Sequence, residues 1–228
     1  MRVGLVGGLG HESTIDYYRR IHTLWARVDP AGAPAIVIDS VDVQFALALL
    51  AEPRQLVNYL LGSLRRLAGA GVDFAAITAN TPHIVFEQLA AVSPVPLVSI
   101  VETCADEARR SGLRHPLLLG TRFTVEAPFY YDVFARYGIE IYRLDNADRT
   151  WVHDRYMGEL LVGDFRDETR QAFIALVERL RRETQIDGVI LGGTELPLLL
   201  TNPHIAGLPV LDTTALHVAA IVRRLREG

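Results

Sequence analysis

The sequence predicts an α/β protein with parallel sheets flanked by helices. Short apolar runs rich in Val, Ile and Leu alternate along the chain with segments whose apolar residues recur at helical spacing. The turns of small residues that follow the strands recur at one offset, close to half the chain length. Gly7 is matched in this way by Gly120, and Thr81 by Thr194. This repetition indicates a duplicated unit and two halves that face each other across a ligand.

The predicted strands are short and apolar, which is typical of parallel strands buried on both faces. They cover residues 3–6, 34–39, 74–77 and 95–98 in the first half, and residues 117–119, 139–142, 189–191 and 209–211 in the second.

Helical spacing of apolar residues predicts most of the intervening helices. They cover residues 13–28, 53–67, 83–91, 102–111, 125–137 and 214–225, and a further helix carries the apolar stripe within 173–180. Two segments stay open at this point. Residues 40–52 form either a flap or a packed helix, and residues 144–154 have no clear period.

Composition predicts a soluble globular protein in the cytoplasm. Half of the 228 residues are hydrophobic and the net charge is −4. The single cysteine allows no disulfide within the chain and no cysteine-based metal site, and the histidines are scattered, so we expect no metal. No apolar run approaches the about 20 residues that cross a bilayer, and no basic stripe suggests a nucleic acid partner.

The glycine-rich turn after the first strand does not predict a dinucleotide site. Gly8-Leu9-Gly10 begins like the dinucleotide fingerprint, but Ser13 stands where its third glycine, or an alanine, should be. We therefore expect no nicotinamide cofactor.

The stretch from Val189 to Leu200 contains a predicted strand, a tight turn and the start of a helix. Gly192 and Gly193 let the backbone turn, and the hydroxyl of Thr194 is placed to cap the helix that follows. Small anions bind where the carboxyl end of a strand faces a helix start. Thr194 is therefore a candidate substrate contact.

The chain resembles the aspartate/glutamate racemase family, the cofactor-independent amino-acid racemases. The motifs that carry the resemblance are GLVGGLGHEST, ANTPH, LLLGTRFTVE, LGGTELPLLL and LDTTALHV, in this order. The resemblance implies two similar α/β domains related by a pseudo-two-fold, with the ligand cleft between them. It places residues 1–98 and 207–228 in the first domain and residues 99–206 in the second, and it implies a homodimer.

The same resemblance exposes a chemical difference at two positions. Racemases of the family use two cysteines, one from a CNT motif and one from a GCTE motif, to remove and return the α-proton. This chain has Ala79 and Gly193 at those positions, and neither side chain carries a proton. Cys104 lies outside both motifs and is interpreted as a small packing residue.

Several residues in the predicted strand-end turns remain candidates for binding and chemistry. By resemblance Asn80, Thr81 and Thr194 hold the substrate carboxylate; Thr121 and Ser13 are further contacts, and Arg122 suits a second carboxylate. The candidate acid–base residues are Glu195, His83 and Glu12, although each also has an ordinary interpretation as a cap or surface residue.

The sequence thus supports two classes of function. The first is a cofactor-independent isomerase of the racemase family, or a related lyase, decarboxylase or cyclase, in which non-thiol groups replace the cysteines. Pyridoxal phosphate is not expected, because the chain contains no lysine to form a Schiff base. The second is a catalytically silent protein that binds an amino-acid-like ligand.

Overall fold

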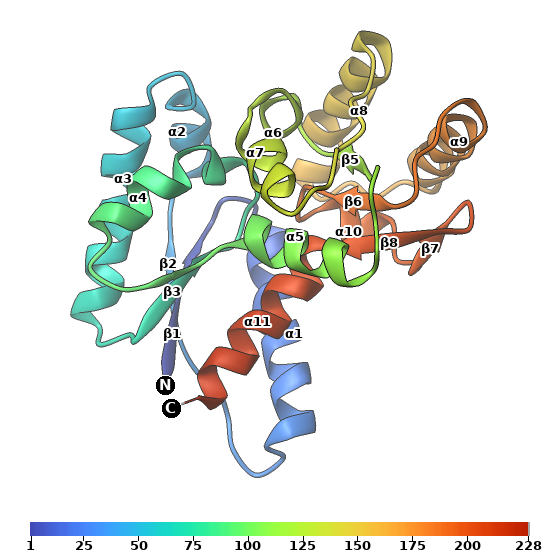
Figure 1. Cartoon of the computed structure of the whole chain (residues 1–228). Coiled ribbons are helices and arrows are strands. Elements are labelled where there is room, and N and C mark those ends of the chain that lie inside the picture. The colour runs from blue at the N-terminus through green and yellow to red at the C-terminus, as the bar shows by residue number, and fades with distance from the viewer. Residues whose placement is uncertain (228) are drawn as a thin grey trace. The chain divides into compact units, whose positions relative to one another are not determined.

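The computed structural model describes residues 1–227, which form two compact α/β units, each with its own sheet. The first unit comprises Met1–Ile100 together with the C-terminal segment from Thr214, and the second is Val101–Thr213. Figure 1 shows the helices and strands by label and chain position. Among the described residues, no helix is long and apolar enough to cross a membrane.

The first sheet is parallel throughout, with the strand order β2-β1-β3-β4. Its strands are β1 (Arg2–Gly7), β2 (Ala35–Ser40), β3 (Phe74–Ile77) and β4 (Leu97–Val98). All four residues of β3 and the last five of β1 are buried, as the continuous apolar runs predict.

Helices cover both faces of this sheet. They are α1 (His11–Val28), α2 (Val43–Ala48), α3 (Pro53–Gly69), the 3-10 helix η1 (Thr81–Val85), α4 (Phe86–Val92) and α11 (Thr213–Arg226). Side chains alternate along β3, so that Ala75 and Ile77 pack with α3 and α4, while Phe74 and Ala76 pack with α1 and α11. The open segment 40–52 contains α2, a packed helix that the Asp42 side chain caps.

The second sheet has the order β5-β6-β8-β7, and only β7 runs antiparallel. Its strands are β5 (Leu117–Leu119), β6 (Val189–Leu191), β7 (His204–Ile205) and β8 (Leu208–Asp212). The turn between β7 and β8 puts Ala206 and Gly207 at positive φ. Since β8 pairs with β6, residues 208–212 lie in the second sheet, whereas the boundary predicted after residue 206 grouped them with the first domain.

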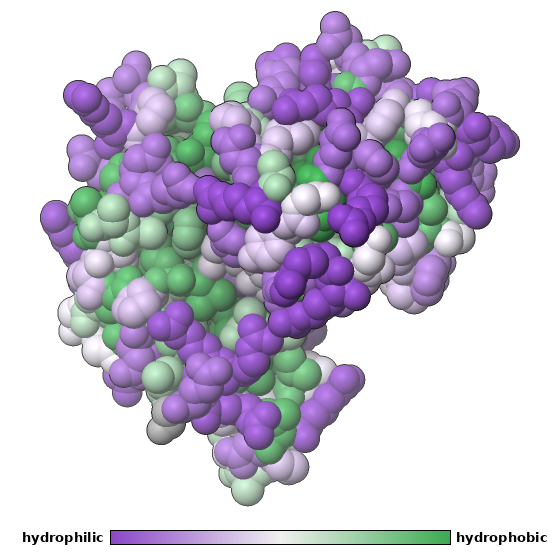
Figure 2. All heavy atoms as spheres, in the orientation of Figure 1, coloured by the Kyte–Doolittle hydropathy of each residue, from purple (hydrophilic) through white to green (hydrophobic). Residues whose placement is uncertain are grey.

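The second unit contains the remaining helices. They are α5 (Ile100–Arg110), α6 (Arg122–Glu126), α7 (Phe129–Arg136), α8 (Asn146–Gly158), the 3-10 helix η2 (Leu160–Val162), α9 (Asp167–Glu183) and α10 (Leu196–Leu199). Phe173 and Val177 of α9 pack with Val152 and Tyr156 of α8 in one core cluster. The outward faces of α8 and α9 are hydrophilic (Figure 2).

The two sheets repeat one arrangement. In the first sheet, β1 has β2 on one side and β3 on the other. In the second sheet, β5 has β6 on one side, and on the other side its Leu117 forms a single parallel bridge with Tyr142. An aspartate also recurs: Asp73 accepts the backbone N–H of Arg2 at 2.5 Å, and Asp187 accepts that of Arg114 at 2.5 Å. These equivalences agree with the duplicated unit that the sequence predicts.

Two local predictions were wrong, and the structure defines one segment that the sequence left open. The helix expected over residues 125–137 is two helices, α6 and α7, because Pro128 interrupts it. The strand expected over residues 139–142 is reduced to the bridge at Tyr142. Residues 144–154, which showed no period, form most of α8, whose Asp145 side chain accepts the N–H of Asp148 as an N-cap.

Candidate functional site

The first half of the candidate site follows β3. Ala79 and Asn80 are buried and Thr81 is half-buried. The backbone carbonyl of Ala79 accepts a hydrogen bond from Nδ1 of His83 at 3.0 Å, and the Asn80 carbonyl accepts the His83 backbone N–H at 2.9 Å. His83 therefore holds the backbone of this turn through hydrogen bonds to the carbonyls of Ala79 and Asn80.

Both ring nitrogens of His83 are used by the backbone. Nδ1 donates to Ala79, and Nε2 accepts the N–H of Ile100 at 3.3 Å, so the ring is neutral. Burial, and then the neighbouring His217, lower the pKa of His83 to about 3. His217 is also neutral: it donates from Nε2 to the Val98 carbonyl at 3.0 Å and accepts the Tyr17 hydroxyl at 2.8 Å, and burial lowers its pKa to about 4.

The glycine-rich turn after β1 is shaped by packing. Gly8 has φ of 80°, and a Cβ at this position would overlap the backbone of Val41. Thr14 accepts the Gly8 N–H at 2.9 Å. Ser13 is buried, whereas Glu12 is partly exposed, and its carboxylate lies 3.3 Å from Nε2 of His11 at the surface.

The second half of the site follows β6 and is buried throughout. Thr194 and Glu195 are only 2% and 3% exposed. The hydroxyl of Tyr156 donates a short hydrogen bond to Oε2 of Glu195, and Thr194 donates to the same oxygen at 3.3 Å. The prediction that Thr194 caps the next helix was wrong, since the N-cap of α10 is Glu195 and the Thr194 hydroxyl contacts the carboxylate instead.

Gly193 has no room for a side chain because Tyr156 occupies that space. A Cβ built on Gly193 would overlap Cε2, Cζ and the hydroxyl oxygen of the Tyr156 ring. Burial, followed by the charge of Glu195, raises the pKa of Tyr156 well above its ordinary value, so the phenol is protonated at neutral pH. The second half thus presents a buried phenol and carboxylate beside residue 193.

Thr121 and Arg122 follow β5. The side chain of Thr121 caps α6 by accepting the Thr124 N–H at 3.3 Å, and the residue is buried. The Arg122 side chain is exposed, while its backbone N–H donates to Nδ1 of His153 at 3.2 Å.

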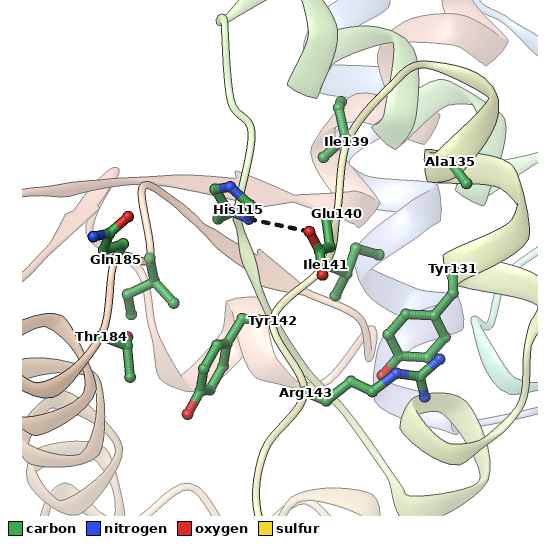
Figure 3. Close-up of a pocket in the computed structure, with 11 residues that line it drawn as sticks. His115, Tyr131, Ala135, Ile139, Glu140, Ile141, Tyr142, Arg143, Thr184 and Gln185 are labelled. Carbon is green, nitrogen blue, oxygen red and sulfur yellow. Dashed lines mark ion pairs between the residues drawn. The ribbon is translucent and has the colours of Figure 1, made fainter.

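A separate cavity of about 590 Å³ lies at the other edge of the second sheet. His115, which precedes β5, and Thr184 and Gln185, which precede β6, line it, and Arg143 stacks on the Tyr131 ring at 3.4 Å (Figure 3). Parallel α/β sheets bind ligands at the carboxyl ends of their strands. This cavity lies at the amino ends and is distinct from the candidate site.

Comparison with known proteins identifies the family. The sequence pattern described as Asp/Glu/Hydantoin racemase matches residues 6–221. The chain belongs to the Asp/Glu/hydantoin racemase family. Racemases are isomerases, and the α/β fold described above is the one that the solved relatives share.

Individual relatives are similar over nearly their whole length. The broad specificity amino-acid racemase RacX of Bacillus subtilis (strain 168) is 24% identical over 224 residues, which cover 93% of each chain. An aspartate racemase homologue from Pyrococcus horikoshii OT3 is 28% identical with a TM-score of 0.83 over 99% of each chain. The aspartate racemase of Picrophilus torridus shares the fold, with 21% identity and a TM-score of 0.80 over 99% of this chain and 95% of its own.

The chain contains one cysteine, and its thiol is not accessible. Cys104 is fully buried inside α5, and burial raises the pKa of its thiol well above the ordinary value, which suits a packing residue. Among the described residues, no group of three or more His, Cys, Asp or Glu side chains could hold a metal ion.

The structure groups the predicted site residues by unit. In the first unit, the predicted site residues lie in two places: Ala79, Asn80, Thr81 and His83 follow β3, and Glu12 and Ser13 lie in the first turn of α1. In the second unit they lie after β5 and β6: Thr121, Arg122, Gly193, Thr194 and Glu195. Their functional roles, and the cleft expected between the halves, stay predictions. Sequence reasoning missed Tyr156, because its helix has no apolar period. The sequence signal for it was Gly193, a residue without a side chain at the end of a buried strand.

The two buried neutral histidines predict a pH dependence of stability. Because their pKa values are lowered in the folded state, the unfolded chain binds more protons between pH 6.5 and about 4. The contribution of the two histidines to the free energy of unfolding should be fully present above pH 6.5. As the pH falls below 6.5, the free energy of unfolding should decrease by at most about 2.7 kcal/mol per pH unit for both histidines together. Urea unfolding from pH 7 to 4.5 measures this, with the exposed His204→Gln variant keeping the wild-type slope. A flat profile would contradict the buried neutral pair.

The overlap at Gly193 predicts a specific coupling in stability. Gly193→Ala should lower the free energy of unfolding by about 1–3 kcal/mol, because the Cβ overpacks against Tyr156. In a Tyr156→Ala background the same substitution should be neutral or stabilising. Urea unfolding of the four proteins measures the cycle, and Gly62→Ala, whose Cβ would meet only the Arg66 side chain at 3.6 Å, is the control. Equal effects in both backgrounds would contradict the overlap.

Proposed function

We propose that this protein is a cofactor-independent isomerase of the racemase family, or a related carbon-acid enzyme, that acts on an amino acid or another small carboxylate. Its reaction moves a proton at the carbon next to the carboxylate. Non-thiol groups carry the proton in place of the cysteines that the resemblance places at residues 79 and 193. A homodimer in the cytoplasm forms part of this proposal.

The observation that carries the proposal is the position of Glu195. The residue is 3% exposed and lies two positions after Gly193, and its carboxylate accepts hydrogen bonds from Tyr156 and Thr194. Burying a carboxylate costs free energy unless hydrogen-bond donors surround it. Buried carboxylates held in this way are common at sites of proton transfer. Glu195 is therefore the acid–base residue that we favour among the three predicted from the sequence.

The other two candidates fit this role less well. Both ring nitrogens of His83 are engaged by the backbone, so the imidazole would have to give up a hydrogen bond to take a substrate proton. Glu12 is partly exposed and pairs with His11, an arrangement that suits a first-turn surface carboxylate. We assign His83 to the support of the turn that carries Asn80.

The names of the relatives and the polar groups at the strand ends support the substrate class that we propose. The similar proteins are named as racemases of amino acids or of aspartate. In our proposal Asn80, Thr81 and Thr194 hold the substrate carboxylate, with Ser13 and Thr121 as further contacts. The exposed guanidinium of Arg122 suits a second carboxylate.

We propose a reaction without pyridoxal phosphate, since the chain has no lysine that could hold this cofactor as a Schiff base. A specific observation also supports a second candidate, a catalytically silent binding protein. Ala79 and Gly193 leave the positions of both expected thiols without any titratable side chain. A protein of this kind binds an amino-acid-like ligand and leaves it unchanged.

Hydrogen exchange at the α-carbon tests the proposal. The purified protein is incubated in heavy water with L-aspartate, L-glutamate and a panel of other L-amino acids, and the α-hydrogen signals are followed by NMR. We expect exchange with at least one compound, and a reduction of about 100-fold or more in Glu195→Gln, as for the loss of a general base.

The matched control is Glu159→Gln. Glu159 is equally buried, at 5% exposure, but its hydrogen bonds are to Thr169 and Arg155, so this variant should lose stability and keep exchange. Wild-type rates in Glu195→Gln would remove the assigned role. A ligand-induced thermal shift without exchange of any compound would favour the binding protein.

A further inference from the structure

We propose that Tyr156 replaces the missing cysteine at residue 193 and is the catalytic acid–base group that touches the substrate carbon, with Glu195 behind it as its proton partner. This inference rests on the proposed function, because it names the atom that meets the substrate on the β6 side. It concerns a residue that lies far from Gly193 in the sequence and outside every motif of the family resemblance.

The ring of Tyr156 occupies the volume that a side chain at residue 193 would need. Residue 193 is the place where the resemblance expects a thiol, and the phenol ring of Tyr156 fills the space into which a side chain there would project. The hydroxyl oxygen itself is one of the atoms that a Cβ on Gly193 would overlap. The chain therefore presents an ionisable oxygen where the family presents an ionisable sulfur.

The second argument is the set of partners of this hydroxyl. It donates to the carboxylate of Glu195, and its oxygen lies 3.5 Å from the Glu195 backbone N–H, which points toward it as a donor. The carboxylate can take the phenol proton while the oxygen accepts another proton, and the backbone N–H can donate to that oxygen as negative charge develops on it. A tyrosine that serves packing alone needs only one acceptor, as Tyr131 has in the Val125 carbonyl at 2.7 Å.

The third argument is the rigidity of the ring. Tyr156 is 4% exposed and sits in the α8 and α9 core cluster, where Phe173 and Val152 are fully buried. A proton-transfer group must be held in place by packing, since small displacements of a reacting atom cost large factors in rate. Tyr156 meets this requirement from the core side of the site.

The proton balance of the step is simple. The phenol proton of Tyr156 passes to the Glu195 carboxylate while the phenol oxygen accepts the α-proton of the substrate. The Cα–H bond breaks, its electron pair remains on the substrate as an enolate of the carboxylate, and Glu195 ends as a carboxylic acid. The reverse sequence returns a proton to carbon, and in heavy water it returns a deuteron.

Tyr156→Phe tests this role, because it keeps the ring in place and removes only the hydroxyl. With the same heavy-water assay and the same amino-acid panel, we expect exchange to fall by about 100-fold or more. The ligand-induced thermal shift should persist, since the variant leaves the proposed carboxylate contacts untouched. Tyr131→Phe, which also removes a hydrogen-bonded phenol hydroxyl but at the other edge of the sheet, should exchange at the wild-type rate.

The outcomes separate this inference from the proposed function. Exchange by the wild type and by Tyr156→Phe at equal rates would overturn the role of Tyr156 and leave the proposed function standing. Absence of exchange by the wild type would overturn the proposed function and, with it, the role of Tyr156. A second variant pair guards against misfolding: Tyr156→Ala should lose exchange, and adding Gly193→Cys to it should restore part of the rate by placing a thiol in the vacated space.

Discussion

The hydrogen bond from Tyr156 to Glu195 is the interaction on which the second half of the site depends. It holds a buried carboxylate directly after β6, and it fixes a phenol ring in the space beside Gly193. Each partner explains the other: the carboxylate would be costly to bury without a donor, and the phenol would be costly to bury without an acceptor. Gly193 follows from this arrangement, because any side chain there would displace the ring.

The duplicated scaffold carries different chemistry at its two strand ends. After β3, the neutral ring of His83 bonds a backbone carbonyl and a backbone amide, and the neutral His217 of α11 bonds the Val98 carbonyl; burial keeps both uncharged. After β6, the buried groups are a phenol and a carboxylate. The two units share the placing of the first strands and the paired aspartates Asp73 and Asp187, while the polar residues at their strand ends differ.

The sequence predicts the framework well because buried parallel strands leave a local signal. Residues 74–77, 117–119 and 189–191 were predicted as strands with the observed bounds. Helix α8 and the role of Pro128 were missed, since a polar helix has no apolar period and a single proline splits a longer pattern. Tyr156 could not be predicted, because its contact with residue 193 depends on how α8 packs over the sheet, and no local pattern encodes that packing.

In our proposal this member of the racemase family transfers a proton at carbon without a thiol. The most direct measurement is α-hydrogen exchange in heavy water by the Cys104→Ala variant, which contains no cysteine at all. Cys104 is buried in α5, so its loss should leave the Tyr156–Glu195 pair in place and the exchange rate at the wild-type value. A folded Cys104→Ala protein that no longer exchanges the substrate α-hydrogen would contradict the account, because the thiol would then be required.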